Sequence, residues 1–146
     1  MDQDWRKTLG GIMEKHARAS RAERENRQFE EFLASVVTPA LNELADELRK
    51  HERIVTIRPL PAAVALSVRN GETEEISFTV LRRSAPNAVV AYAEIRLRKG
   101  QGQRFVKIES NIREGQAPLE QTTGEDIIGC FLKYYGQVLE AGTQDS

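Results

Sequence analysis

The sequence predicts a single α+β domain, in which a five-stranded antiparallel meander packs on an N-terminal amphipathic helix and a C-terminal helix closes the fold. Three patterns predict it. Apolar residues recur at three- and four-residue steps from Phe29 to Leu48. The period changes to two through residues 54–110, and a second helical period runs from Ile127 to Leu139. The 146 residues, 40% hydrophobic and 29% charged, suffice to bury one core.

The first segment, residues 1–28, is predicted to be a charged helical arm, and residues 29–146 to be the domain itself. The stretch EKHARASRAERENRQFEE holds almost no large apolar residue. Pairs such as Glu14 with Arg18 stand at i,i+4 with the acid first, the favourable order, and stabilise a helix by tenths of a kcal/mol each. We therefore expect a solvated arm, with an arm that binds a partner as the alternative.

The apolar helix that follows is interrupted by Thr38-Pro39. Threonine suits an N-cap and proline suits the first helical position, so a second helix could begin here. The alternative is one continuous helix with a kink. We expect a break or a sharp kink at this point.

The period-two region reads as five strands joined by turn-forming stretches, which makes an antiparallel meander. Pro59 and Pro61 damage the first strand and place it at an edge of the sheet. The five predicted strands are residues 54–60, 62–69, 74–83, 88–98 and 104–110.

Charge pairing across the last hairpin predicts its register. A four-residue KGQG loop places Arg98 opposite Gln103 and sets Glu94 against Lys107. A two-residue loop would set Arg96 against Lys107, and like charges directly opposed are destabilising. We therefore expect the longer loop.

The preceding hairpin, with SAPN as a four-residue loop, pairs Phe78 with Ala93 and gives one apolar face. On that face the small Ala91 and Ala93 leave room for the Phe29–Leu48 helix to approach. In the Asn70-Gly71 hairpin, we expect a one-residue bulge near Gly71, or a three-residue loop, so that Leu66 faces Ile76.

The last helix begins with Thr122-x-x-Glu125, a capping-box pattern, and Gly142 suits its C-terminus. Gly129 and Gly136 lie on one face, and each costs a helix interior about 1 kcal/mol relative to Ala. We expect close packing there, against the sheet, another helix or a second subunit.

Catalytic and cofactor motifs are absent: the sequence contains no G-x-S-x-G, H-E-x-x-H, Walker loop or dinucleotide fingerprint. Glu47 and His51 would supply only two metal ligands, and His51 suits a helix C-terminus. Cys130 lies mid-helix and is predicted to be a buried structural thiol. We therefore expect no catalytic residue, cofactor or metal.

The net charge of −1 conceals an asymmetry. Residues 82–113 carry eight basic and two acidic groups, whereas residues 114–146 carry one basic and six acidic. The two segments could neutralise each other within the fold, so the asymmetry alone is weak evidence for a polyanionic partner. The candidate polyanion contacts are Arg82, Arg83, Arg98, Lys99 and Arg104.

The resulting functional hypothesis is a cytoplasmic, non-catalytic interaction module that assembles as a homodimer. No apolar run approaches the ~20 residues that span a bilayer, the acidic start lacks a signal-peptide core, and a single cysteine fits a reducing compartment. One alternative is nucleic-acid or polyanion binding through the basic hairpin tip, and another is a small apolar ligand held between sheet and helix around Ala91 and Ala93. The candidate interface residues are Phe29, Phe32, Val36, Gly129 and Gly136.

Overall fold

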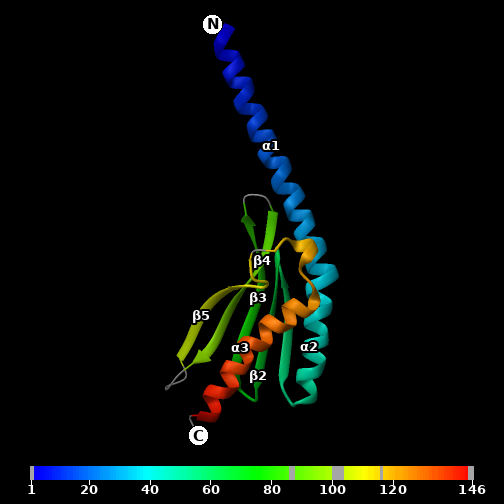
Figure 1. The fold of residues 1–146 in the computed structure, drawn as a ribbon, viewed down its shortest axis with the longest axis vertical. Coiled ribbons are helices and arrows are strands. Elements are labelled where there is room, and N and C mark those ends of the chain that lie inside the picture. The colour runs from blue at the N-terminus through cyan, green and yellow to red at the C-terminus, as the bar shows by residue number, and fades with distance from the viewer. Residues whose placement is uncertain (1, 86–87, 100–103, 116, 145–146) are drawn as a thin grey trace.

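The computed structural model describes residues 2–85, 88–99, 104–115 and 117–144, and it confirms the predicted α+β fold (Figure 1). One antiparallel sheet has the strand order β1-β2-β3-β4-β5, so the meander and the edge position of β1 are confirmed. The strands are β1 Ile54–Leu60, β2 Ala63–Asn70, β3 Thr73–Ala85, β4 Ala88–Lys99 and β5 Arg104–Asn111. The helices are α1 Asp2–Phe32, the π-helix η1 Leu33–Val37, α2 Thr38–Lys50, the 3-10 helix η2 Leu119–Gln121 and α3 Gly124–Gln144.

The first helix does not break at Thr38-Pro39, so of the two predicted alternatives, a break or a kink, the break is wrong. Thr38 has helical dihedrals (φ −60, ψ −46), and its N–H donates to the carbonyl of Leu33, five residues back. In an α-helix, the ring of Pro39 would clash with the carbonyl four residues before it, and one N–H would be missing. The π turn adds a residue to the hydrogen-bonded ring and lets the chain pass the proline as a continuous helix.

Helices α2 and α3 cover the same face of the sheet. Helix α2 lies along β1, α3 lies across β3 and β4, and the two helices contact each other. Phe78 of β3 and Phe131 of α3 meet edge to face at 5.6 Å in the centre of the core. Ala91 and Ala93 are buried in the same core as Phe29 and Phe32 of the predicted segment, while a turn of only three residues holds α2 beside the edge strand β1.

The β3–β4 pairing differs from the prediction by two residues. Phe78 stands opposite Ile95 instead of Ala93, and Ala85 stands opposite Ala88. The shift is even, so the paired residues 76–85 of β3 keep their predicted faces. It also pairs Phe78 with a larger apolar partner. Residues 86–87, on which the SAPN loop prediction falls, lie outside the described residues.

The β4–β5 pairing also differs by two residues and has the register that like-charge repulsion was expected to exclude. Glu94 stands opposite Glu109, and Arg96 stands opposite Lys107. The charges are relieved along diagonals instead: Lys107 Nζ lies 3.4 Å from Glu94 Oε1, and Arg83 Nη2 lies 3.1 Å from Glu109 Oε2. The KGQG loop prediction falls on residues 100–103, outside the described residues.

The β2–β3 hairpin contains the predicted bulge, at a different place. Asn70 pairs with Thr73 around a two-residue turn, in which Gly71 has φ +63. The register shifts further along, where β3 has the extra residue Glu75, and Leu66 faces Phe78 instead of Ile76. The bulge turns the Glu75 side chain toward the helices, where it meets α3.

The start of α3 has a capping box one residue later than predicted. The Asp126 N–H donates to Thr123 Oγ1, and the Thr123 N–H donates to Asp126 Oδ2 at 2.9 Å. The predicted cap, Thr122, is buried and donates its hydroxyl to the Pro118 carbonyl, so it is occupied in holding η2.

The other face of the sheet bears no helix within the described part of the chain. It carries side chains such as Thr79, Leu81, Tyr92 and Glu94, all of them partly exposed. This face of the sheet therefore presents a mixed polar and apolar surface.

Candidate interaction surfaces

Helix α1 leaves the body of the protein and projects into solvent (Figure 1). All residues from 4 to 19 are exposed, and we call them the arm. The helix first meets the body where Ser84 Oγ donates to Glu25 Oε2, and its first buried side chain is Phe29. The arm has no packing within the described chain that would hold it in place.

The arm nevertheless carries a row of large apolar side chains, which we call the arm stripe. Trp5, Leu9, Ile12 and Met13 are 54%, 48%, 57% and 57% exposed. Their i, i+4, i+7, i+8 spacing places them on one side of the helix. At 100° per residue, Leu9 and the buried Phe29 point about 160° apart, so the stripe faces away from the chain's own sheet.

This stripe was not predicted from the sequence, because residues 1–28 were predicted to be a charged arm. The signal that could have revealed it is the spacing of Trp5, Leu9 and Ile12 itself. Gly10 and Gly11 obscured it, since a glycine pair usually ends a helix.

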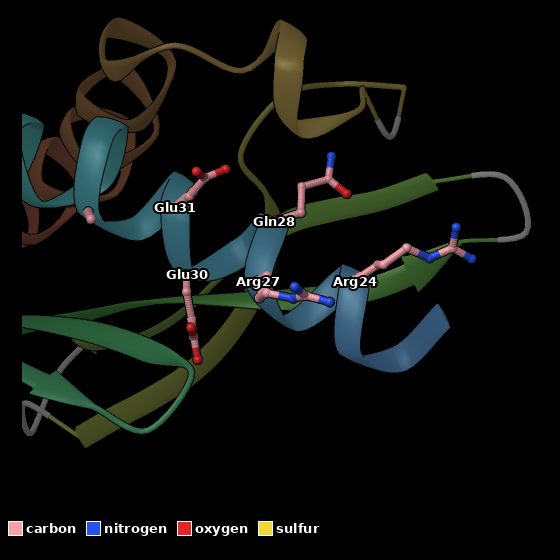
Figure 2. Close-up of a pocket in the computed structure, with 6 residues that line it drawn as sticks. Arg24, Arg27, Gln28, Glu30 and Glu31 are labelled. Carbon is pink, nitrogen blue, oxygen red and sulfur yellow. The ribbon is translucent and has the colours of Figure 1, made fainter. Parts of the chain in front are cut away.

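Nearer the body, the same side of α1 becomes charged. Arg27 lies eighteen residues, or five whole turns, after Leu9. A shallow depression here is lined by Arg24, Arg27, Gln28, Glu30, Glu31 and Ala34 (Figure 2). The cations Arg24 and Arg27 stand toward one end of it and the carboxylates Glu30 and Glu31 toward the other (Figure 2), so the large apolar surface on this side of α1 is confined to the first part of the arm.

Helix α3 presents a second exposed surface. Gly129 is exposed and Gly136 partly so, and a Cβ added at either would have no neighbour within 4 Å. The predicted close packing of these glycines is thus not made within the described chain. Leu132 and Leu139, 53% and 40% exposed, lie on the same side of the helix. We call these four residues the α3 face.

The other candidate interface residues lie elsewhere. Phe29 and Phe32 stack on each other with centroids 5.9 Å apart and are buried in the chain's own core. Val36 is partly buried and lines a depression with Thr123 and Gly124 at the start of α3. Of the five candidates, only Gly129 and Gly136 lie together on an open surface.

The five candidate polyanion contacts fall into two groups. Arg82 and Arg83 stand near the end of β3, and Arg98, Lys99 and Arg104 stand at the β4–β5 hairpin. Val90, the partner of Arg83, is eight residues from Arg98 along β4, or about 26 Å. The structure does not bring the groups together.

Several of these cations already have partners. Arg83 pairs with Glu109 and stacks over Tyr92 at 4.3 Å. Arg98 Nε donates to the Glu74 carbonyl at 2.9 Å, and its guanidinium lies 4.5 Å from the centre of the Phe105 ring. Arg82 differs, because its Nη1 is buried without a hydrogen-bond partner, and Arg104 is exposed. The Lys99 side chain lies outside the described part.

A polar triad joins the sheet to α3. Arg53 Nε and the Tyr135 hydroxyl both donate to Glu75 Oε1, at 2.8 and 2.7 Å. Burial, followed by the Glu75 hydrogen bond, raises the pKa of Tyr135 to about 12. Burial alone would lower the pKa of Arg53, but its bonds to Glu75 and Tyr135 outweigh that effect and the pKa is raised. The three side chains of the triad are joined by hydrogen bonds, so we interpret the triad as a structural link between the sheet and α3.

Other reactive groups are sparse. Burial raises the pKa of the Cys130 thiol above its ordinary value, which disfavours the nucleophilic thiolate. Within the described ranges, no three His, Cys, Asp or Glu side chains gather in a way that could hold a metal ion. The described helices also include none with the length and apolar character needed to cross a membrane.

The chain matches no protein-family model, no curated protein and no solved structure. Its own surfaces are therefore the basis for assigning a function.

Proposed function

We propose that this chain is a non-catalytic assembly module that forms a homodimer through its projecting arm. The observation that carries the proposal is the arm stripe. Four large apolar side chains, each about half exposed, share one side of a helix that nothing in the described chain covers. Exposed apolar surface of this kind, rimmed by charged residues, is typical of protein–protein contacts.

Covering the arm stripe would contribute a favourable free energy large enough to drive association. Taking roughly 200 Å² for a fully exposed large side chain, the stripe presents about 430 Å² of apolar surface. At about 25 cal/mol per Å², covering it yields roughly 10 kcal/mol before the costs of association. An isolated helix containing Gly10 and Gly11 is marginal in water, because each glycine costs about 1 kcal/mol. A partner would therefore stabilise both the stripe and the helix that presents it.

The surfaces favour assembly over polyanion binding. The arm stripe is apolar, whereas the candidate cations lie in two groups, and Arg83 and Arg98 already hold carboxylate, carbonyl or ring partners. A protein whose main partner is nucleic acid needs an uninterrupted cationic surface along the phosphate backbone. Ala91 and Ala93 are buried in the core, which favours packing over a ligand at that place.

The test is the oligomeric state of full-length chains in analytical ultracentrifugation. The variant Leu9→Gln/Ile12→Gln removes half of the stripe, and Glu14→Gln/Arg18→Gln is the control on the opposite side of the arm. We expect a dimer for the wild type and the control. The stripe variant should dissociate at least about a thousandfold more readily, because four half-exposed side chains per dimer lose their cover.

Circular dichroism supplies the folding control, since the arm lies outside the core and the melting of the body should not change. A wild type that is monomeric at high micromolar concentration refutes the proposal. A stripe variant that dimerises as tightly as the wild type refutes it equally.

A further inference from the structure

Helix α3 exposes two glycines beside two leucines, and we infer that this α3 face receives the arm of a second copy. Each chain would then lend its arm to the other in a reciprocal exchange. The inference rests on the proposed homodimer and names the surface that completes it.

The glycines are the first observation. Gly129 and Gly136 together cost α3 about 2 kcal/mol relative to alanine, and no atom of the described residues within 4 Å of a Cβ added at either position explains that cost. A glycine lets another backbone approach closely, and interaxial distances between helices depend on the side chains at the contact. The two glycines are seven residues, or about two helical turns, apart. They leave a shallow groove, which we call the track, beside Leu132 and Leu139, and a second helix can pack into it.

The dimensions of the two surfaces match. From Trp5 to Met13 the arm stripe rises about 12 Å, and from Gly129 to Leu139 the α3 face rises about 15 Å. Each surface is therefore about two to three helical turns long. The arm also projects beyond the body, which leaves its sides open to a neighbouring molecule (Figure 1).

Charge distinguishes the α3 face from the other obvious partner, a second arm. Residues 4–19 contain four basic and two acidic groups, a net charge of +2. Residues 124–144 contain three acidic groups and one basic, a net charge of −2. Arm against α3 brings opposite charges together, with Glu125 and Glu140 exposed near the two ends of the face. Arm against arm brings two positive segments together.

Buried area points the same way. Leu132 and Leu139 add about 190 Å² to the 430 Å² of the arm stripe, on the same scale of roughly 200 Å² per side chain. Two reciprocal contacts cover about 1,200 Å², the lower limit for specific interfaces, whereas pairing two stripes covers about 860 Å². A two-fold axis closes the exchange, so that the assembly stops at a dimer.

Cysteine cross-linking tests which surfaces meet. Chains carrying Met13→Cys are mixed with chains of different tag length carrying Leu132→Cys, and the mixture is oxidised. We expect the mixed arm–α3 product to dominate, and the wild type to remain uncross-linked because its one cysteine, Cys130, is buried. Dominance of the arm–arm product, or of the α3–α3 product, overturns the inference.

A second variant tests the glycines by ultracentrifugation. Gly129→Gln/Gly136→Gln fills the track with side chains that also favour helix, and Asn42→Gln, at an exposed position of α2, is the control away from the face. We expect the glycine variant to be at least as stable as the wild type but to dissociate at least a hundredfold more readily. If it dimerises like the wild type while Leu9→Gln/Ile12→Gln does not, the α3 site is wrong and the arm-dependent dimer stands. If neither variant weakens the dimer, the proposed function fails as well.

Discussion

The link between Glu75, Arg53 and Tyr135 makes a sharp prediction about stability, for which the perturbation is Glu75→Gln. The change keeps the size of the side chain and an oxygen that accepts hydrogen bonds, but it removes the negative charge. Glu75 sits in a bulge of β3 with only 10% of its side chain accessible, and its Oε1 receives both Arg53 Nε and the Tyr135 hydroxyl. Arg53 would then be a cation without a counter-charge.

The magnitude follows from how deeply the pair is buried. Removing one partner of a fully buried ion pair costs about 3–5 kcal/mol, and a surface pair contributes roughly 0–1 kcal/mol. The Arg53 side chain keeps 21% of its accessibility, so water can solvate part of the orphaned charge. We therefore expect Glu75→Gln to lower the free energy of unfolding by about 2 kcal/mol, or the melting temperature by roughly 6 °C.

Urea and thermal unfolding followed by circular dichroism provide the assay. The matched control is Glu109→Gln, which breaks the exposed pair with Arg83 and should cost well under 1 kcal/mol. A double-mutant cycle with Arg53→Met isolates the coupling between the two charges. If Glu75→Gln costs no more than Glu109→Gln, or if the cycle shows no coupling, the account of Glu75 as a stabilising link is wrong.

Two further predictions concern α3. Tyr135→Phe should cost about 1 kcal/mol at neutral pH. The pKa of Tyr135 is raised to about 12, so the contribution of its hydroxyl is complete below the unfolded value near 10 and is lost as the pH rises toward 12; urea unfolding across that range should show the wild type converging on the variant. Gly129→Ala/Gly136→Ala, measured in the monomeric Leu9→Gln/Ile12→Gln background, should raise the free energy of unfolding by about 2 kcal/mol, and a loss of stability in thermal melts would show that these glycines serve the chain's own packing.

The faces of the sheet could be predicted from the sequence, but its registers could not. Alternation of apolar and polar residues assigns each side chain to a face whichever even shift is chosen. The choice between Phe78 opposite Ala93 and Phe78 opposite Ile95 depends on packing against α3, which local patterns do not contain. The like charges that stand opposite each other did not prevent the β4–β5 register, because Lys107 forms an ion pair with Glu94 diagonally across the two strands.

The helix at Pro39 shows the same limit in another form. Proline forbids an ordinary α-helical hydrogen bond there, and the sequence therefore predicted a break or a sharp kink. The structure keeps a continuous helix through a π turn. Val37 before Pro39 and Leu41 after it are both buried, which favours a single packed surface along the helix. The π turn accommodates the missing hydrogen bond of Pro39, and packing of the helix against the core favours this solution over a helix end.

The candidate surfaces divide in a similar way. The spacing of Gly129 and Gly136 marked one side of α3 in advance, and the structure added that this side faces solvent with Leu132 and Leu139 beside it. Phe29 and Phe32 looked equally available in the sequence but are buried in the chain's own core. Periodicity shows which residues share a side of a helix, and only the fold shows what that side faces.

The sequence by itself determined the α+β class, the meander, the edge position of β1 and the two faces of each strand, because hydrophobic period and turn chemistry are local properties. The tertiary structure alone decided the strand registers, the π turn before Pro39, the inward position of Glu75 and the outward direction of the arm stripe. Each of these depends on which distant surfaces meet, and the free energy of those contacts belongs to the folded chain as a whole.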